Sequence, residues 1–292
     1  MRARLGKMAS NRTFWRGLAS IAIFLVLWEI GSRSEQWMAA DIFAPLRDLV
    51  RAMGFRKDYL PWVGAVPAPS AVLASWLEVV DDPSYWQSWY MSLFRVMAGF
   101  IAAMLIGIPF GLALAMSRTA YGIGFPAFEV LRPIPPLAWV PASIIFWPTQ
   151  ELAIAFITFL GAFYTIVINV LGGARSIDAR YFQAAQSMGA SRWDIFRRIV
   201  LPGTLPSIVV GAAVGMGITW EVVVAAEMIS GGGSQIGGTS GGGLGFFIWN
   251  SYIGGSYEQI VVGMISIGIA GYASSELLRW GGRYVTPWLK VR

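Results

Sequence analysis

The sequence predicts an all-α, polytopic membrane protein with about six transmembrane helices. Hydrophobic residues make up 56% of the 292 residues and charged residues only 13%, and the mean hydropathy is +0.59. A soluble globule of this size needs more polar surface than that. The apolar residues also form runs close to the ~20 residues that a helix needs to cross the hydrocarbon core. We therefore expect the lipid bilayer to be the chain's main environment.

The composition also excludes several classes of function. The chain has no cysteine and no histidine, which removes disulfides, Cys/His zinc sites, thiol nucleophiles and the commonest general base. It contains no H-E-x-x-H or G-x-S-x-G motif and no paired aspartates within the apolar runs, so we expect neither an enzyme nor a metal site. The net charge of +6 comes from cations at the ends of apolar runs, which indicates membrane topology and not nucleic-acid binding.

The first transmembrane helix is expected at residues 17–37. Residues 1–16 carry five basic residues and no acid, which predicts a cytoplasmic N-terminus. Trp28 and Trp37 lie near the far end as interfacial anchors. A signal peptide is the alternative, but the apolar run is long and no small-residue cleavage site follows it.

Residues 38–89 are expected to form an ordered external segment, because acidic residues outnumber basic ones there. Within it, Pro69 and Ser70 followed by Ala71–Val80 predict a capped helix. This helix either lies at the membrane interface or is a loop helix without a role.

Residues 90–280 are expected to contain five further spans, with residues 281–292 as a cytoplasmic tail. Glycine pairs in three of these spans place small residues on one helical face, where helix backbones approach closely; they are Gly107 with Gly111, Gly211 with Gly215, and Gly268 with Gly271. With the N-terminus inside, the topology puts Arg118, the loop of residues 173–206 and the tail on the cytoplasmic side, as the positive-inside rule requires. The spans are predicted near Met91–Met116, Ile123–Trp147, Leu152–Leu171, Ser207–Ile229 and Gln259–Trp280.

One of these spans contains a stretch that no regular helix can cross. In Leu131–Pro141, four prolines interrupt the sequence LRPIPPLAWVP and remove backbone donors. Irregular backbone at membrane depth is tolerated only where protein or a water-filled cavity satisfies it. The stretch is therefore our candidate lining of a pathway or gate.

Charged and aromatic side chains in the spans add further candidates. Arg132 follows Glu129 by three residues, so it either pairs with that acid or offers its donors to a planar oxyanion in a central cavity. Glu227 is expected to bond backbone groups at a helix break, while Glu221 is either structural or directed toward a pore. Trp139 and Trp220 face either a pore or the lipid, and aromatic residues in spans more often serve packing. The candidate pathway and gate residues are Arg132, Pro135, Pro136, Trp139, Trp220, Glu221 and Glu227.

A glycine-rich stretch, SGGGSQIGGTSGGG, starts the predicted external loop at residues 230–257. It lacks a Gly-Lys-Ser/Thr ending and follows no predicted strand, so it is not a phosphate loop. We expect a flexible connection, with a ligand-binding lid as the alternative. Since no other nucleotide motif is present, any ATP that drives this protein must be bound by another subunit.

The polar loop between the fourth and fifth spans carries clear local signals. Asp178 is expected to cap a helix through Ser187, and Gly189 to end it in a left-handed conformation. Ser191 and Asp194 form an S-x-x-D capping box that opens a second helix, and we expect Pro202 to stop that helix. Two short helices around a glycine corner make a rigid knob suited to docking.

These motifs resemble a known family. Ala184-Ala185, Gly189 and Leu201-Pro202 look like the EAA loop of ABC importer permeases. LRPIPPLAWVP, the AAEM of 225–228 and the GLGFFIWNSY of 243–252 resemble the permeases of the nitrate, bicarbonate, sulfonate and taurine group, in the family's order. The resemblance extends from about residue 66 to 280 and is greatest to the nitrate and bicarbonate branch.

The resemblance implies a type I ABC importer permease with a methionine-permease-like fold, in a bacterial inner membrane. It implies an importer for a small anion, built from a second permease copy, two ATPase subunits that bind ATP and Mg, and an extracytoplasmic substrate-binding protein, with no cofactor in this chain. An ion-coupled secondary transporter or channel is the alternative. The residues expected to dock on the ATPase are Gln183, Ala184, Ala185, Ser187, Met188, Gly189, Ala190 and Ser191.

Three positions depart from the family's pattern. Gln183 replaces the usual glutamate of the loop, which removes a charge but keeps a hydrogen-bonding group. Phe146–Phe156 replaces a Phe-Gly-x-Gly-x-x-x-Lys pattern, so a cation expected there is missing. Ser230–Gly242 is longer and richer in glycine than the family's loop. Nothing in the residues distinguishes one anion from another, or a homodimer from a heterodimer.

Overall fold

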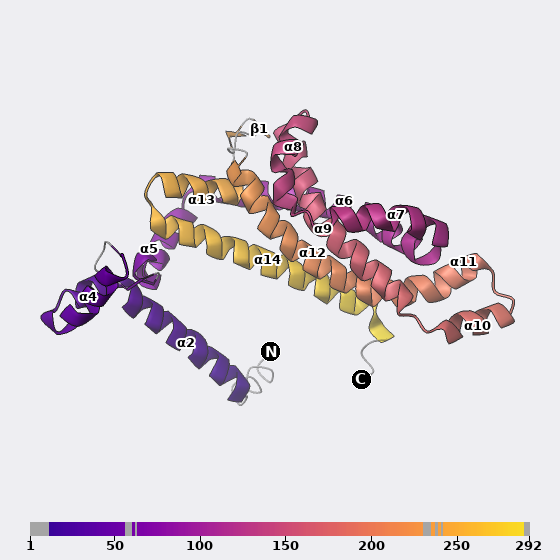
Figure 1. The fold of residues 1–292 in the computed structure, drawn as a ribbon, viewed down its shortest axis with the longest axis horizontal. Helices are drawn as coiled ribbons and strands as arrows, with labels where there is room; N and C mark the ends of the chain where they lie inside the picture. The colour runs from indigo at the N-terminus through magenta and orange to yellow at the C-terminus, as the bar shows by residue number, and fades with distance from the viewer. Residues whose placement is uncertain are drawn as a thin grey trace. The chain divides into compact units, whose positions relative to one another are not determined.

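The computed structural model describes residues 12–55, 60–61, 63–229, 235–236, 239–240 and 242–288, and almost all of them are helical, as predicted (Figure 1). The chain divides into two compact units. The first comprises Met1–Asp82 with Ser251–Val262, and the second comprises Pro83–Asn250 with Gly263–Arg292.

In the first unit, the apolar helix α2 precedes several short elements. α2 ends at Ser32, ahead of the predicted end at residue 37, and Trp37 then donates from Nε1 to the carbonyl of Ile30 at 2.8 Å. The helix predicted over Ala71–Val80 is present as α5, but the predicted cap is wrong, because Pro69 and Ser70 lie within the helix. The elements are α2 (Arg12–Ser32), α3 (Ser34–Met38), η1 (Asp41–Phe43), α4 (Ala44–Ala52), η2 (Val63–Ala65) and α5 (Pro69–Val80).

The carboxylate of Glu29 on α2 caps the N-terminus of α5. The N-cap residue of α5, Ala68, makes no side-chain cap hydrogen bond. Glu29 accepts instead from the backbone amide of Ser70 at 3.1 Å and from its hydroxyl at 2.8 Å. Arg33 donates to the same carboxylate at 2.7 Å. A negative charge at a helix N-terminus is favourable, so this contact ties α5 to α2.

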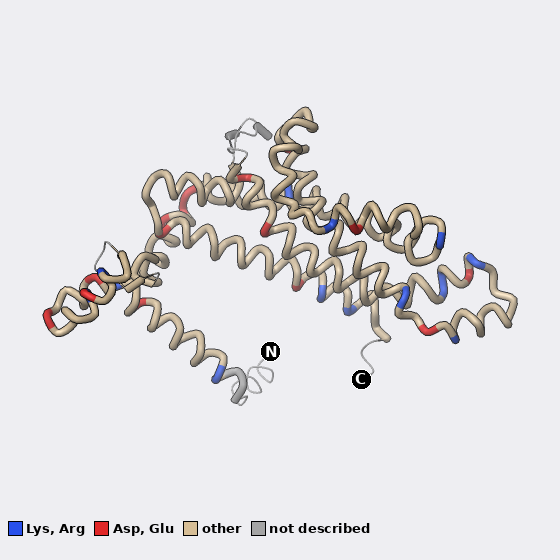
Figure 2. The backbone as a smooth tube through the Cα atoms, viewed as in Figure 1, with Lys and Arg blue, Asp and Glu red and all other residues tan. Residues whose placement is uncertain are grey.

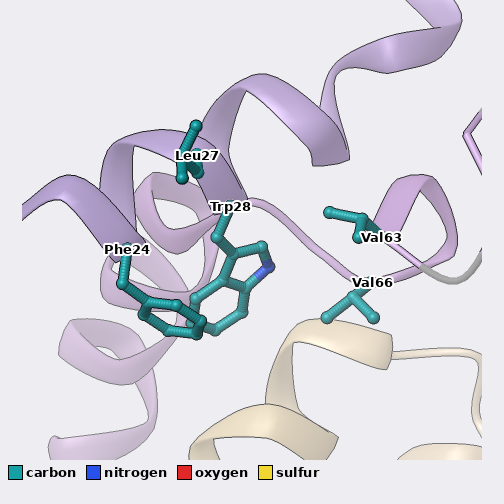
Figure 3. Close-up of a pocket in the computed structure, with 5 residues that line it drawn as sticks. All are labelled: Phe24, Leu27, Trp28, Val63 and Val66. Carbon is teal, nitrogen blue, oxygen red and sulfur yellow. The ribbon is translucent and has the colours of Figure 1, made fainter. Parts of the chain in front are cut away.

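An apolar hollow of about 440 Å³ lies between α2 and η2. Figure 3 shows the rings of Phe24 and Trp28 on one side and Val63 and Val66 on the other. Its lining carries no charged side chain. It lies on a helix whose apolar residues are mostly exposed, so we regard it as part of the lipid-facing surface.

The second unit contains the longest helices, and α13 and α14 each have residues in both units. Its elements are α6 (Pro83–Met116), α7 (Arg118–Leu131), η3 (Pro136–Trp139), α8 (Val140–Phe146), α9 (Gln150–Arg175), α10 (Ala179–Ser187), α11 (Arg192–Ile195), η4 (Phe196–Val200), α12 (Leu201–Ile229), β1 (Gln235–Ile236), β2 (Thr239–Ser240), α13 (Gly243–Ile253) and α14 (Tyr257–Val285). The two short strands pair antiparallel, with Gln235 opposite Ser240.

Six segments among the described residues are long and apolar enough to cross a membrane. Five of them overlap predicted spans, although α6 begins at Pro83 and not near Met91. The remaining segment, Val63–Val80, matches no predicted span. The six segments are Trp15–Ser32, Val63–Val80, Pro83–Met116, Gln150–Arg175, Arg192–Ile229 and Tyr257–Val285.

The predicted span at Ile123–Trp147 is wrong as a single helix. α7 ends at Leu131, a non-helical turn follows, and η3 and α8 continue the chain. The prolines of Leu131–Pro141 explain the break, because they lack amide donors and push each preceding residue out of the helical region. The prediction that no regular helix crosses this stretch is therefore confirmed. The predicted external loop at residues 230–257 also contains a helix, α13.

Helix α9 lies between α6 and α12 and packs against both at glycines. A Cβ at Gly111 of α6 would lie 2.9 Å from the side chain of Val170, and a Cβ at Gly211 of α12 would lie 2.8 Å from Asn169. The predicted close approach of backbones is thus confirmed for these helices. Of the pair predicted in α14, Gly271 lies close to Trp220 of α12, 3.6 Å from its Cβ position, while Gly268 has no described atom within 4 Å of its own.

An aromatic cluster joins α7 to α6 and α9. Phe128 of α7 is buried and packs against Tyr164 of α9, with ring centroids 5.6 Å apart, and against Phe110 of α6, at 6.2 Å. These contacts determine where α7 ends relative to the middle of α9.

Substitution by alanine is expected to have opposite effects at a glycine in close helix contact, Gly111, and at a glycine in open space, Gly268. Gly111→Ala is expected to lower the free energy of unfolding by about 1–3 kcal/mol, because the new methyl group overpacks the α6–α9 contact. Gly268→Ala is the matched control and is expected to be neutral or stabilising by up to about 1 kcal/mol, because alanine favours the helix. Thermal unfolding of the purified variants in detergent measures both. An unfolding midpoint for Gly111→Ala at or above that of the wild type would contradict the packing.

Candidate functional site

The polar connection from α10 to η4, residues 178–200, is called the α10–α11 loop here. Asp178 caps α10 as predicted, and its side chain accepts from the amide of Arg180 at 2.9 Å. The guanidinium of Arg180 also pairs with it at 2.6 Å. These hydrogen bonds lower the pKa of Asp178 below its ordinary value, so the cap stays ionised at neutral pH.

The glycine corner has the predicted geometry. Gly189 has a φ of +76°, and the amides of Gly189 and Ala190 donate to the carbonyls of Gln186 and Ala185, which is a Schellman motif. Ser191 and Asp194 form the complete capping box at the start of α11. Both predicted caps and the glycine corner are therefore confirmed.

The prediction that Pro202 stops the second helix is wrong. α11, η4 and α12 form one continuous helical segment that passes through Pro202. η4 is a π-helical turn, in which the amide of Leu201 donates to the carbonyl of Phe196, five residues back. This wider turn shifts the hydrogen-bond register directly before the proline, where an amide donor is absent. The loop is thereby joined to α12 without a break in the helix.

The α10–α11 loop exposes large apolar side chains. The exposed fractions are 81% for Met188, 64% for Tyr181 and 66% for Trp193. Of the predicted docking residues, Ala185 is buried and Ala190 is half-buried. The others are exposed: Gln183, Ala184, Ser187, Met188, Gly189 and Ser191. Exposed apolar side chains on an otherwise polar connection are typical of an interaction surface.

Basic residues gather at the same end of the second unit. Figure 2 shows blue segments on the loop, at the start of α7 and near the end of α14. The acids at this end are paired; Glu276, for example, accepts from Arg279 at 2.9 Å. The predicted excess of positive charge on these connections is therefore concentrated at one end of the helices.

The predicted pathway residues do not form a single site. Arg132 pairs with Glu129 at 3.0 Å, as one alternative predicted, and together with Pro136 it also lines a cleft of about 300 Å³ against the middle of α9. Pro135 and Glu221 are exposed. Trp139 is half-buried and packs edge-on against Phe156.

Trp220 and Glu227 lie elsewhere. Trp220 is 2% exposed, and its Nε1 donates to the hydroxyl of Ser274 on α14 at 3.0 Å, so it packs between helices and does not line the cleft. Glu227 is fully buried. It accepts from the amide of Gly245 at 2.9 Å, which confirms that it bonds backbone at a helix break.

Glu227 also takes part in a network that the sequence analysis missed. Arg95 of α6, 1% exposed, donates to Glu227 of α12 at 2.9 Å and to Glu151 of α9 at 2.6 Å. Ser92 bridges Glu227 and the amide of Leu244. Arg95 also donates to the carbonyl of Gly242 at 3.3 Å. The network therefore holds three helices and the start of α13.

A signal for this network was present in the sequence. A charge inside an apolar span needs a partner, and Arg95 lies alone in the predicted span of residues 91–116. Glu151 falls within Phe146–Phe156, where the sequence differs from the family's Phe-Gly-x-Gly-x-x-x-Lys pattern. An acid there supplies the arginine with a second carboxylate.

Removing the arginine should be costly. Arg95→Met leaves Glu227 buried without its cation, and we expect the free energy of unfolding to fall by about 3–5 kcal/mol. Arg279→Met removes an exposed pair and serves as the control, with an expected loss of at most about 1 kcal/mol. The yield of monodisperse protein in detergent and its thermal midpoint measure the difference. Equal loss in the two variants would contradict a structural role for the buried network.

Comparison with known proteins places the chain in a family. Residues 107–291 match the family described as binding-protein-dependent transport system inner membrane component. The chain is 34% identical to the nitrate import permease protein NrtB of Leptolyngbya laminosa, over 71% of each chain. It is 33% identical to the taurine transport system permease protein TauC of Escherichia coli, over 76% of this chain and 80% of that one. It is 32% identical to the bicarbonate transport system permease protein CmpB of Synechococcus elongatus, over 70% and 71%.

Two solved structures share the fold. A chain of the inward-facing MetNI methionine ABC transporter aligns with a TM-score of 0.51 at 24% identity, over 69% of this chain and 92% of that one. A chain of a bacterial ABC transporter for the acidic polysaccharide alginate aligns with a TM-score of 0.54 at 16% identity, over 93% and 99%. These likenesses confirm the predicted methionine-permease-like fold, and the relatives are non-catalytic transmembrane subunits. The chain is a multi-pass membrane protein that belongs to the family of binding-protein-dependent transport system inner membrane components, the permease subunits of ABC transporters.

Proposed function

We propose that this chain is the permease subunit of an ATP-driven, binding-protein-dependent importer for a small anion. The observation that carries the proposal is the α10–α11 loop. Its backbone is fixed by two caps and a glycine corner, while Met188 at its tip is 81% exposed. A surface that is both rigid and apolar is suited to a partner, here an ATPase subunit.

The continuous helix after the loop supports a mechanism of alternating access. A push on the loop passes through η4 into α12 without a flexible joint. α12 contacts α9 at Gly211, so a tilt of α12 is transmitted to the centre of the unit. With two copies of the chain, closure of the ATPase pair would draw the two loops together and open the spans to the other side.

The other subunits of the proposed assembly are inferred from the missing nucleotide motif and from the transport systems to which the relatives belong. The chain carries no nucleotide motif, so two ATPase subunits would bind ATP and Mg. A substrate-binding protein would deliver the anion on the opposite face. The basic end of the second unit supports a cytoplasmic position for the loop and the end of α14, in a bacterial inner membrane. The five basic residues of 1–16 support the same position for the N-terminus.

The proposed substrate class comes from the relatives. Nitrate and bicarbonate are small oxyanions, and taurine carries a sulfonate at one end. All three relatives are named for such molecules, at 32–34% identity. We therefore propose a small solute with a planar or tetrahedral oxyanion group.

A charge at the tip of the loop should uncouple the transporter. We expect Gly189→Glu and Met188→Glu to abolish ATP-driven uptake and co-purification of the ATPase, because each puts a charge into the docking surface. Gly189→Asn is the control, since asparagine tolerates the left-handed conformation without adding a charge. Uptake into proteoliposomes and the ATPase content after purification measure the effect. Unchanged uptake in both charged variants would contradict docking of the loop on the ATPase subunit.

Purification from the native membrane tests the assembly as a whole. We expect an ATPase subunit to co-purify with the chain in near-equal amount. A chain that purifies alone even after cross-linking, and whose transport follows an ion gradient, would favour the ion-coupled alternative instead.

A further inference from the structure

A cleft lies between the proline-broken segment and α9. We propose that Arg132, Tyr164 and Thr165 bind the oxyanion group of the transported solute there. The inference rests on the proposed function, because it assigns the anion a place within the permease.

The position of the cleft suits a transport site. It is lined by Arg132, Pro136, Leu160, Gly161, Tyr164, Thr165, Ile168 and Ile218, and has a volume of about 300 Å³. The α9 residues lie in the middle of that 26-residue helix, and Ile218 lies well inside α12. The cleft therefore sits near the middle of two long spans, where transporters commonly bind their substrates.

The depth of Arg132 follows from the short helix before it. α7 turns back from the end of α6 and has 14 residues, which extend about 21 Å at 1.5 Å per residue. This length is less than the ~30 Å of the hydrocarbon core. Phe128, one turn before Arg132, is held against Tyr164. Helix α7 then ends next to α9, so that Arg132 lines the cleft.

Three residues with hydrogen-bond donors line this cleft: Arg132, Tyr164 and Thr165. The guanidinium of Arg132 has five N–H groups and makes one hydrogen bond, to Glu129 at 3.0 Å. Tyr164 and Thr165 of α9 are half-buried, and their hydroxyls have no hydrogen-bond partner among the described residues. A planar fork plus two hydroxyls matches the oxygens of a small oxyanion.

The rest of the lining favours weak, reversible binding. Leu160, Ile168 and Ile218 give the cleft an apolar side, and an apolar surface strengthens the interaction of a charge with the arginine. Two acids oppose it. Glu129 competes for the guanidinium, and Glu221 follows Ile218 by three residues on the same face of α12. An importer needs such a balance, because a tightly held anion would not leave.

The fold does not need Arg132. Its pair with Glu129 is 41% and 43% exposed, and a pair of this kind contributes little to stability. An effect of Arg132 on transport can therefore be separated from an effect on folding. The chain also offers a matched control, since Arg279 pairs with Glu276 at the same spacing, at 2.9 Å and with 46% and 41% exposure.

The test uses proteoliposomes that contain the permease, its ATPase subunits and saturating substrate-binding protein. The probe is whichever of nitrate, bicarbonate and taurine the wild-type complex carries. Arg132→Gln is expected to lower the uptake rate about tenfold or more, the factor for one hydrogen bond to a charged group. Arg132→Lys should recover part of the rate. Tyr164→Phe and Thr165→Val should each lower it severalfold, and Arg279→Gln should leave it unchanged.

ATP hydrolysis and complex assembly are measured in parallel. We expect all five variants to assemble with the ATPase and to hydrolyse ATP at close to the wild-type rate. Wild-type uptake in Arg132→Gln, or an equal loss in Arg279→Gln, would overturn the assignment of the cleft. A wild-type chain that binds no ATPase, or carries none of the three probes, would instead overturn the proposed function.

Discussion

Arg95 is a cation with 1% exposure inside a long apolar helix, and the surrounding structure is arranged to compensate its charge. Neither a carboxylate nor a guanidinium is stable alone in such a place. Glu227 of α12 and Glu151 of α9 therefore have to meet α6 at one level, and the start of α13 joins them through Gly242 and Gly245.

The glycine contacts extend the same arrangement along the helices. Gly111 and Gly211 let α6 and α12 approach opposite sides of α9, so α9 becomes the centre of the second unit. The cleft of Arg132 and the α10–α11 loop both connect to this centre. α12 begins at the loop and carries Ile218 of the cleft, so one rigid helix links the proposed docking surface with the proposed anion site.

Sequence reasoning predicted features that depend on a few adjacent residues. Asp178, Gly189 and the Ser191–Asp194 box specify their caps through bonds to neighbouring backbone, so their geometry follows from local sequence alone. The prolines of residues 131–141 break a helix for an equally local reason. Pro202 is the exception, because the π turn before it rearranges the hydrogen bonds that the proline would otherwise interrupt.

The sequence by itself therefore determined the membrane class, most of the spans, the capped loop and the broken segment, because composition and short-range backbone bonding decide them. The tertiary structure decided which helices face one another. Arg95 and Glu227 are 132 residues apart, and no local pattern pairs them. Tyr164 and Thr165 read as ordinary residues of a span until α7 ends beside them. Such contacts depend on how whole helices pack, which the spacing of residues along one helix does not specify.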